Sequence, residues 1–203
     1  MTEWFRRKSK NIKTFDKRDT TEGNWIKCPS CDEVLYKKVL ENSFSVCGNC
    51  NYHFRLNFSK YIELICDNNE YEEFGNDITS LDPLSFKSKK EYNEQLKHYI
   101  KKTNQKSAVK TVKTRIKEVD VILAVMNFEF IGGSMGSVVG HKIGIAIEKA
   151  DREKVPLIIV TASGGARMQE GVLSLMQLAK TTTKLAKFSD NGGLFIAILT
   201  DPT

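Results

Sequence analysis

The second half of the chain alternates apolar runs, glycine-containing loops and segments with helical periodicity. The apolar run Val121–Phe128 leads into the loop Ile131–Gly136, and a helix-like stretch continues to Ala150. The run Val155–Thr161 leads into Ala162-Ser-Gly-Gly165, and another helix-like stretch follows, carrying Val172, Leu173, Leu175, Met176 and Ala179. Apolar strands that alternate with helices are typical of crossover connections. The pattern predicts an α/β core with Leu194–Thr200 as a third buried strand.

The first half has shorter elements. Ser59 is placed to cap a helix that runs to Cys66, and Ser88-Lys-Lys-Glu91 has the spacing of a capping box. The capping box would open a helix whose apolar stripe is Tyr92, Leu96, Tyr99 and Ile100. Two strands are predicted next, at 108–116 and 119–128, with Lys117-Glu118 near the turn between them.

Composition narrows the class of protein. The chain has 203 residues and 40% hydrophobic content, enough for one domain and a small appendage. Its longest apolar runs are far shorter than the ~20 residues of a membrane span. The basic N-terminus lacks the apolar segment of a secretory signal. These features predict a cytoplasmic protein without a membrane partner.

Positive charge is concentrated in one window. The net charge is +6, and residues 87–117 hold eleven Lys and Arg against Glu91 and Glu94, a local charge of 11 − 2 = +9. Such a window suits nucleic acid, an anionic ligand or an acidic partner, or it is a solvated face. Charge alone does not choose between them.

Four of the five cysteines form two pairs with metal-site spacing. Cys28 and Cys31 make one CxxC, and Cys47 and Cys50 make another fifteen residues later. Each CxxC turn directs two sulfurs at one point, so two turns complete a tetrahedral zinc site. The alternative, two disulfides, is disfavoured in a reducing cytosol. We predict a zinc ribbon, with strands at 34–40 and 43–46, whose four thiolates leave no open position for substrate.

Two other residues near this motif have plainer interpretations. Cys66 lies in an apolar helical pattern and is interpreted as a small core residue. His53 follows the last CxxC, but four cysteines already complete the zinc shell, so it is interpreted as a surface or strand residue. Aromatic residues among lysines would also suit a ribbon that binds nucleic acid: Trp25, Tyr36, Phe44, Tyr52 and Phe54.

The two glycine loops leave backbone N–H groups at the junction of a strand and a helix. Such a junction can cradle a phosphate or form an oxyanion hole, or it can be a tight turn and nothing more. Neither loop has the GxxxxGK[ST] or GxGxxG pattern of nucleotide sites. Ser163 is not in a GxSxG elbow, which argues against a serine hydrolase. Spacing alone does not separate the remaining interpretations.

Several motifs in order resemble one family. They are CPSC (28–31) with CGNC (47–50), DPLSF (82–86), FIGGSMGSVVG (130–140), ASGGARMQEG (162–171), SLMQLAK (174–180) and LTDPT (199–203). Together they resemble the bacterial acetyl-coenzyme A carboxylase carboxyltransferase β subunits, from about residue 24 to the end. The resemblance implies a flexible basic segment at 1–24, a four-cysteine zinc ribbon at 25–56 and a crotonase-type (ClpP/crotonase) α/β domain at 57–203. Family members continue past TDPT, so we expect this domain to be truncated at its C-terminal end.

The resemblance also implies a function. The β subunit would pair with an α subunit as an α2β2 enzyme and work with the biotin carboxyl carrier protein and biotin carboxylase. It would transfer the carboxyl group of carboxybiotin to acetyl-CoA, giving malonyl-CoA for fatty acid synthesis. The proton acceptor would be the biotin ureido nitrogen, which explains why no catalytic His or Glu stands out. Zn²⁺ would be structural.

Site residues follow from the same resemblance. The backbone amides of Gly164, Gly165 and Ala166 would hold the thioester oxygen. Substrate-binding residues would be Gly132, Gly133, Ser134, Ser163 and Arg167, although Arg167 could instead pair with Glu170. Glu170 is interpreted as a first-turn charge rather than a general base.

Two other functions stay open at this point. One is a zinc ribbon protein that binds nucleic acid. The other is a related acyl-CoA enzyme, such as a propionyl-CoA carboxyltransferase or a hydratase, although the acid and base carboxylates of a hydratase are not apparent.

Overall fold

The computed structural model describes residues 23–203, so the predicted flexible segment at 1–24 lies almost entirely outside the described residues. The chain divides into two compact units between Arg55 and Leu56, beside the predicted boundary after residue 56.

Within residues 23–55, the first unit has three short elements. Strand β1 (Trp25–Lys27) pairs antiparallel with β2 (Val34–Tyr36), and helix α1 (Lys37–Asn42) follows at once. The predicted strand at 34–40 is therefore wrong beyond Tyr36. Leu40 is the one buried residue of α1. A short helix places this single apolar side chain inward and leaves the lysines and Glu41 in solvent. The predicted return strand at 43–46 is reduced to a single bridge between Val46 and His53.

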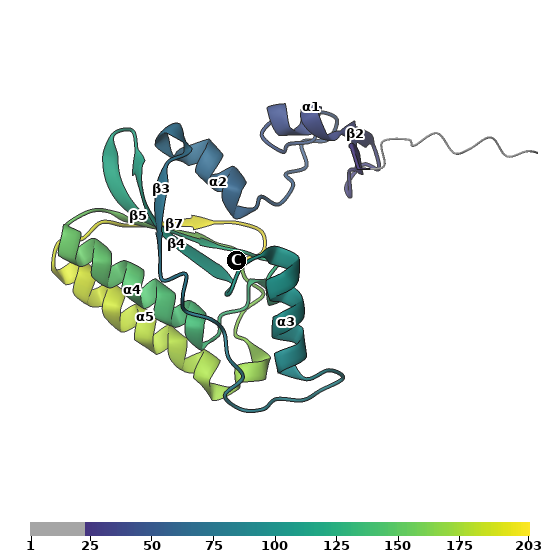
Figure 1. The fold of residues 1–203 in the computed structure, drawn as a ribbon. Helices are drawn as coiled ribbons and strands as arrows, with labels where there is room; N and C mark the ends of the chain where they lie inside the picture. The colour runs from purple at the N-terminus through teal and green to yellow at the C-terminus, as the bar shows by residue number, and fades with distance from the viewer. Residues whose placement is uncertain (1–22) are drawn as a thin grey trace, which may run out of the picture. The chain divides into compact units, whose positions relative to one another are not determined.

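The second unit is built on one five-stranded sheet (Figure 1). Its order is β3 (Tyr71–Phe74), β4 (Val109–Ile116), β5 (Val119–Met126), β6 (Leu157–Thr161) and β7 (Phe195–Leu199). The first three strands are antiparallel to one another, and β5, β6 and β7 are parallel. The predicted alternation of parallel strands with crossover helices is confirmed.

Helices cover both faces of this sheet. Helix α4 (Ser137–Glu153) connects β5 to β6, and α5 (Val172–Asp190) connects β6 to β7. Helix α4 packs on β4, β5 and β6, whereas α5 packs mainly on α4 (Figure 1). Helix α2 (Phe58–Ile65) packs on β5, on the face of the sheet opposite α4. Helix α3 (Tyr92–Thr103) precedes β4.

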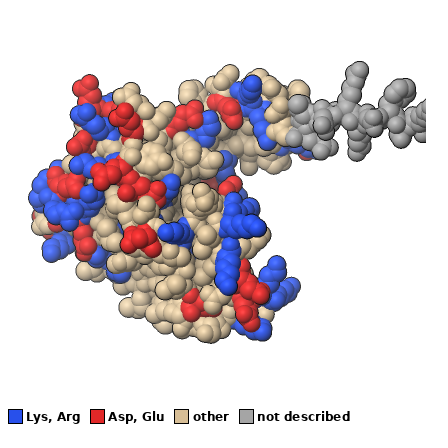
Figure 2. Space-filling model, in the orientation of Figure 1, with Lys and Arg blue, Asp and Glu red and all other residues tan. Residues whose placement is uncertain are grey.

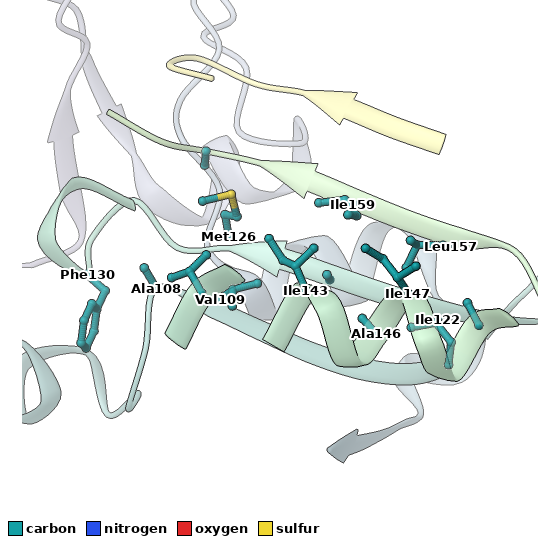
Figure 3. Close-up of a cluster of buried hydrophobic side chains, with 14 of the residues drawn as sticks. Ala108, Val109, Ile122, Met126, Phe130, Ile143, Ala146, Ile147, Leu157 and Ile159 are labelled. Carbon is teal, nitrogen blue, oxygen red and sulfur yellow. The ribbon is translucent and has the colours of Figure 1, made fainter. Parts of the chain in front are cut away.

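The main core lies between α4 and the sheet. Ile143, Ala146 and Ile147 of α4 meet Ile122, Leu157 and Ile159 of the sheet (Figure 3). The second cluster joins Phe58, Ile62 and Cys66 to the opposite face of β4, β5 and β6. Cys66 is thus a core residue, as predicted. These two clusters hold β5 and β6 rigidly, and with them the loops at their carboxyl ends.

The last two elements expose apolar side chains. Helix α5 buries Ser174, Gln177, Thr181 and Phe188 and exposes Val172, Leu175, Met176 and Leu178. Strand β7 is an edge strand whose Phe195, Ile196 and Leu199 are exposed. A third strand is present at the predicted position, but it is not buried. Among the described residues, no element covers the outer side of β7.

Two helices begin where local capping did not predict. Helix α2 starts one residue before Ser59, and the side chain of Asn57 accepts a hydrogen bond from the Lys60 N–H at 3.0 Å. Helix α3 starts after Glu91, and no side chain caps it. The capping box predicted at Ser88 is absent; instead Tyr92 N–H donates to the Phe86 carbonyl at 2.9 Å.

The β4–β5 hairpin turns at Lys117 and Glu118, without a glycine. Lys117 and Glu118 both have positive φ, 50° and 66°, a conformation that is unfavourable for residues with a Cβ. Both of their N–H groups donate to the carboxylate of Asp67, at 2.9 and 2.7 Å. These hydrogen bonds lower the pKa of Asp67, and they stabilise the turn.

Charged residues are interspersed rather than gathered in one field. On the face in Figure 2, Lys and Arg lie among Asp and Glu, with uncharged surface between them. Many pairs are close, such as Lys113 and Glu153 at 2.8 Å. No helix among residues 23–203 has the length and apolar content to cross a membrane.

Candidate functional site

The four cysteines of the two CxxC motifs converge on one point. Cys28 Sγ lies 3.6 Å from Cys50 Sγ, and Cys31 Sγ lies 3.8 Å from Cys47 Sγ. All four sulfurs lie within 4.8 Å of one another, and none is in a disulfide. Four sulfurs around Zn²⁺ at ~2.3 Å form a tetrahedron with edges of about 3.8 Å. The arrangement fits zinc, and the disulfide alternative is excluded for this structure.

The two turns that carry the sulfurs have the same backbone geometry. In the first, the Asp32 N–H donates to the Cys28 carbonyl at 2.9 Å; in the second, the Asn51 N–H donates to the Cys47 carbonyl at 2.9 Å. Asp32 and Asn51 both have positive φ, near 60°, which Asp and Asn tolerate better than most residues. These two residues set the turns, and the sequence analysis did not single them out.

The cysteines differ in how readily they ionise. A hydrogen bond from Asn49 lowers the pKa of Cys31 to about 6, whereas desolvation raises the pKa of Cys50 to about 11. Zinc binds thiolates and so deprotonates both kinds of thiol. With all four positions filled by sulfur, the site has a structural rather than a catalytic character.

The remaining ribbon residues leave its surface role open. His53 is exposed and bridges to Val46, as predicted for a surface or strand residue. Trp25 and Phe44 are exposed, and Trp25 lies 5.1 Å from the ring of Tyr36. Nucleic-acid binding by this surface stays a prediction.

The two glycine loops meet at one edge of the sheet. They follow β5 and β6, which are parallel neighbours, so their carboxyl ends lie together. The Gly164 N–H donates to the Gly132 carbonyl at 2.8 Å. A Cβ on Gly133 would lie 1.9 Å from the Ala162 oxygen, so no other residue fits there without moving a loop. The loops are in backbone contact, which explains a glycine at 133.

The three predicted oxyanion amides are not equivalent. The N–H of Gly164 is engaged by the Gly132 carbonyl, as just described, and so links the two loops; its predicted catalytic role stays a prediction. The Gly165 N–H donates to Ser163 Oγ at 3.0 Å. The Ala166 N–H has no hydrogen-bond partner among the described residues, and Ala166 is exposed. Ala166 therefore offers a ready donor, and Gly165 offers a second when Ser163 turns away.

Met135 fixes the direction of the Ala166 N–H. The Met135 N–H donates to the Gly165 carbonyl at 2.9 Å, and the Met135 carbonyl accepts from the Arg167 N–H at 3.0 Å. This short parallel bridge holds the residues on both sides of Ala166. A donor that is preorganised in this way needs no rearrangement when a negative charge develops in front of it.

Beneath the loops lies a buried polar cluster centred on Arg167. Arg167 and Glu170 are both fully buried, with Nη1 3.4 Å from Oε1. The guanidinium also donates to Ser134 Oγ at 3.0 Å and to the Ser134 carbonyl at 2.6 Å. Arg167 has no exposed surface. The ion pair with Glu170 is the alternative that the structure contains, and the substrate contact of Arg167 stays a prediction.

Glu170 links three elements. Its Oε1 accepts from the Tyr92 hydroxyl at 2.8 Å, and its Oε2 accepts from the Ser137 N–H at 2.6 Å. Ser137 is the first residue of α4, where the helix dipole favours a negative charge. A Cβ on Gly136 would lie 2.4 Å from the Glu170 carboxylate, so glycine is required there. The interpretation of Glu170 as a charge at a helix start is correct in kind, but the helix is α4 rather than α5.

Sequence reasoning missed two members of this cluster. Tyr92 was expected only in the apolar stripe of α3, yet its hydroxyl also accepts from Arg167 at 3.1 Å. Ser80 contributes its hydroxyl to Arg167 at 3.3 Å. These partners are 75 and 87 residues from Arg167, so no local pattern could have indicated them. Burial and the lost hydrogen bonding to water raise the pKa of the Tyr92 hydroxyl.

We expect Glu170→Gln to destabilise the second unit by about 3–5 kcal/mol, because it leaves the Arg167 charge buried without its partner. Tyr92→Phe is the matched control: it removes one hydroxyl and no charge, so a loss of about 1–3 kcal/mol is expected. Urea unfolding followed by far-UV circular dichroism measures both. Equal, small losses for the two variants would contradict a charge-paired cluster.

Comparison with known proteins gives consistent matches for both units. Residues 25–50 match the family described as the acetyl-CoA carboxylase zinc finger domain, and residues 75–203 match the carboxyl transferase domain. The acetyl-coenzyme A carboxylase carboxyl transferase subunit beta of Prosthecochloris aestuarii is 43% identical over 200 residues, which cover 98% of this chain and 72% of the relative. That of Desulforamulus reducens is 47% identical over 188 residues, covering 93% and 64%.

A solved structure also resembles this fold. It is a transcarboxylase 12S crystal structure, 24% identical, with a TM-score of 0.51 over 64% of this chain and 24% of that chain. At that identity the likeness concerns the fold alone. The chain spans about two thirds of the length of the curated relatives. The predicted zinc ribbon followed by a carboxyltransferase α/β domain is confirmed.

Proposed function

The chain belongs to the family of acetyl-coenzyme A carboxylase carboxyl transferase β subunits, and from this premise we propose that it binds the acyl-CoA substrate of carboxyl transfer. The proposed reaction moves a carboxyl group from carboxybiotin, delivered on its carrier protein, to acetyl-CoA. The product is malonyl-CoA. The substrate, the partners and the assignment of each residue below belong to this proposal.

The observation that carries the proposal is the unpartnered, exposed N–H of Ala166 at the carboxyl end of β6. Removing a proton from the methyl group of a thioester puts negative charge on the thioester oxygen. An N–H held in advance toward that oxygen stabilises the charge. Ala166, joined by Gly165 when Ser163 releases it, is proposed as the oxyanion donor, and the Gly132–Gly133 loop as the neighbouring wall.

The buried cluster supports a reaction in which these loops supply no general base. Glu170 lies four residues after Ala166, and it is fully buried and bound to Tyr92, Arg167 and the Ser137 N–H. A carboxylate enclosed in this way has no surface that a substrate at the loops could contact. We therefore do not assign Glu170 as the general base, which agrees with a carboxyl transfer better than with a hydratase.

The exposed apolar face of α5 supports a protein partner. Val172, Leu175, Met176 and Leu178 lie in solvent on one helix, and contiguous exposed apolar surface of this kind marks interaction sites. We propose that the carboxyltransferase α subunit buries this face. A role beside the biotin carboxyl carrier protein and biotin carboxylase rests on the family alone.

The decisive experiment is reconstitution with the α subunit. This chain, and a version extended to the full length of its curated relatives, are each mixed with the α subunit, and malonyl-CoA decarboxylation is followed with free biotin as acceptor. We expect turnover from the extended pair and none from either subunit alone. An inactive extended pair that assembles normally would overturn the proposal, and methylmalonyl-CoA in place of malonyl-CoA tests the propionyl-CoA alternative.

A further inference from the structure

A polar pocket, separate from the glycine loops, lies between the segment after β3, the start of β4 and helix α4. Its volume is about 290 Å³, near the lower end of the ~300–1,000 Å³ range of small-molecule sites. Lys142 of α4 and the segment 104–107 line it, together with residues of β3 and β4. The glycine-loop site does not use any of these residues.

Lys142 is an unusual residue for the interior of a helix-to-sheet contact. The residue is 3% exposed and lines the pocket, and its Nζ is not among the fully buried atoms that lack a partner. The stem of Lys142 passes beside Gly75, where an added Cβ would be 3.7 Å from Cε. An ammonium that has lost most of its water costs stability, and a bound anion at the pocket would offset that cost.

The charges around Lys142 leave an excess of positive charge. Lys110 and Glu73 are already paired, with Nζ 3.1 Å from Oε2. Lys106 is exposed at the pocket, and Asp77 is the other carboxylate that acts on Lys142. With three ammonium groups against two carboxylates, the surroundings carry a net charge of 3 − 2 = +1. Desolvation lowers the pKa of Lys142, and a bound anion would offset that effect.

The wall formed by residues 104–107 is fixed in place. Asn127 Nδ2 donates to Gln105 Oε1 at 3.1 Å, and the Ser80 N–H donates to the Lys106 carbonyl at 3.1 Å. Ser107 is buried, and its Oγ donates to the Val109 carbonyl at 2.8 Å. Asn127 directly follows β5 and precedes the Gly132–Gly133 loop. The pocket therefore flanks the same end of the sheet as the two glycine loops.

We propose that this pocket binds a phosphate group, with Lys142 as its buried cation and Lys106 as its exposed one. The phosphate comes either from the coenzyme A part of the substrate, in which case this inference rests on the proposed function, or from a free phosphorylated ligand. The chemistry at the pocket is the same in both cases. A compact ammonium is a common point-charge partner for phosphate.

The binding test needs no activity. Inorganic phosphate and pyrophosphate are added to this chain at constant ionic strength, with sodium chloride as reference, and thermal unfolding is followed. At ten times Kd the melting temperature should rise by about 3–6 °C. Lys142→Met should abolish the rise, and Lys106→Gln should weaken it. Lys102→Gln, at an exposed lysine of α3 outside the pocket, should keep it. No rise in the wild type, or the same rise in Lys142→Met, would overturn the proposal.

Two further arms identify the source of the phosphate. In the reconstituted enzyme, a coenzyme source predicts that Lys142→Met raises KM for malonyl-CoA at least tenfold and leaves KM for malonyl-pantetheine unchanged. A free ligand predicts unchanged KM values for both, together with the loss of phosphate protection. If Lys142→Met does not fold, Lys106→Gln is used for the same KM and melting-temperature measurements, with a smaller expected effect. If the reconstituted enzyme is inactive, the melting-temperature measurement still decides whether the pocket binds phosphate.

Discussion

Loss of the metal should unfold the ribbon and leave the five-stranded unit intact. The ribbon has two three-residue strands and one six-residue helix, and among its described residues only Cys28, Leu40 and Cys47 are buried apolar residues. So small a core does not stabilise the fold without a bound metal or a cross-link. Zinc contributes on the order of 10–16 kcal/mol of apparent binding energy to such sites. We therefore expect Cys47→Ser to lose both the metal and the structure of residues 25–54.

The measurement combines metal content with hydrogen exchange in both units. The wild type should hold one zinc per chain, and Cys47→Ser should hold none. Hydrogen exchange across residues 25–54 should then become fast, while hydrogen exchange in β5 and β6 stays slow. Cys66→Ala is the matched control, because Cys66 is buried in the second unit and lies outside the sulfur cluster. One zinc retained in Cys47→Ser would contradict the four-thiolate site.

The sequence located best those features whose cause is local. The zinc ligands depend on the spacing within each CxxC and on one loop, so Cys28, Cys31, Cys47 and Cys50 were identified together. Strands β5 and β6 contain continuous apolar runs that the sheet buries, and β4 intersperses buried Val and Thr with Lys. Their bounds agree with the predicted ones within about two residues, which is the usual uncertainty of element ends.

Features that depend on distant partners were missed or misread. Tyr92 is the first residue of helix α3, and its hydroxyl bonds to Glu170, 78 residues away, a contact that no capping rule contains. For Arg167 the sequence left substrate binding and a pair with Glu170 open, and it did not indicate that Tyr92 and Ser134 also bind the guanidinium. The turn at Lys117 needs no glycine because Asp67 binds its N–H.

The glycine loops also combine a local feature, which the sequence shows, with contacts to distant residues, which it does not. The sequence proposed residues 164–166, which stays a prediction, but it could not tell which of the three amides makes no internal hydrogen bond among the described residues. That depends on the Gly132 carbonyl, which engages Gly164, and on Met135, which orients Ala166. Both lie about 30 residues earlier in the chain and meet the second loop only because β5 and β6 are parallel neighbours.

The second large effect is expected from Ala166→Pro. Proline removes the N–H without breaking a hydrogen bond, since this N–H makes none among residues 23–203. Ala166 does not have the positive φ that would exclude proline, and Gly165 before it tolerates the restriction that proline imposes. In the reconstituted enzyme, kcat/KM for malonyl-CoA should fall by about 10²–10³-fold, the usual loss for one oxyanion donor. Ala166→Ser keeps the N–H and should lose far less, and thermal unfolding of both variants checks that the loops remain folded. Turnover of a folded Ala166→Pro enzyme within threefold of the wild type would remove Ala166 from the reaction and leave Gly165 as the donor to test.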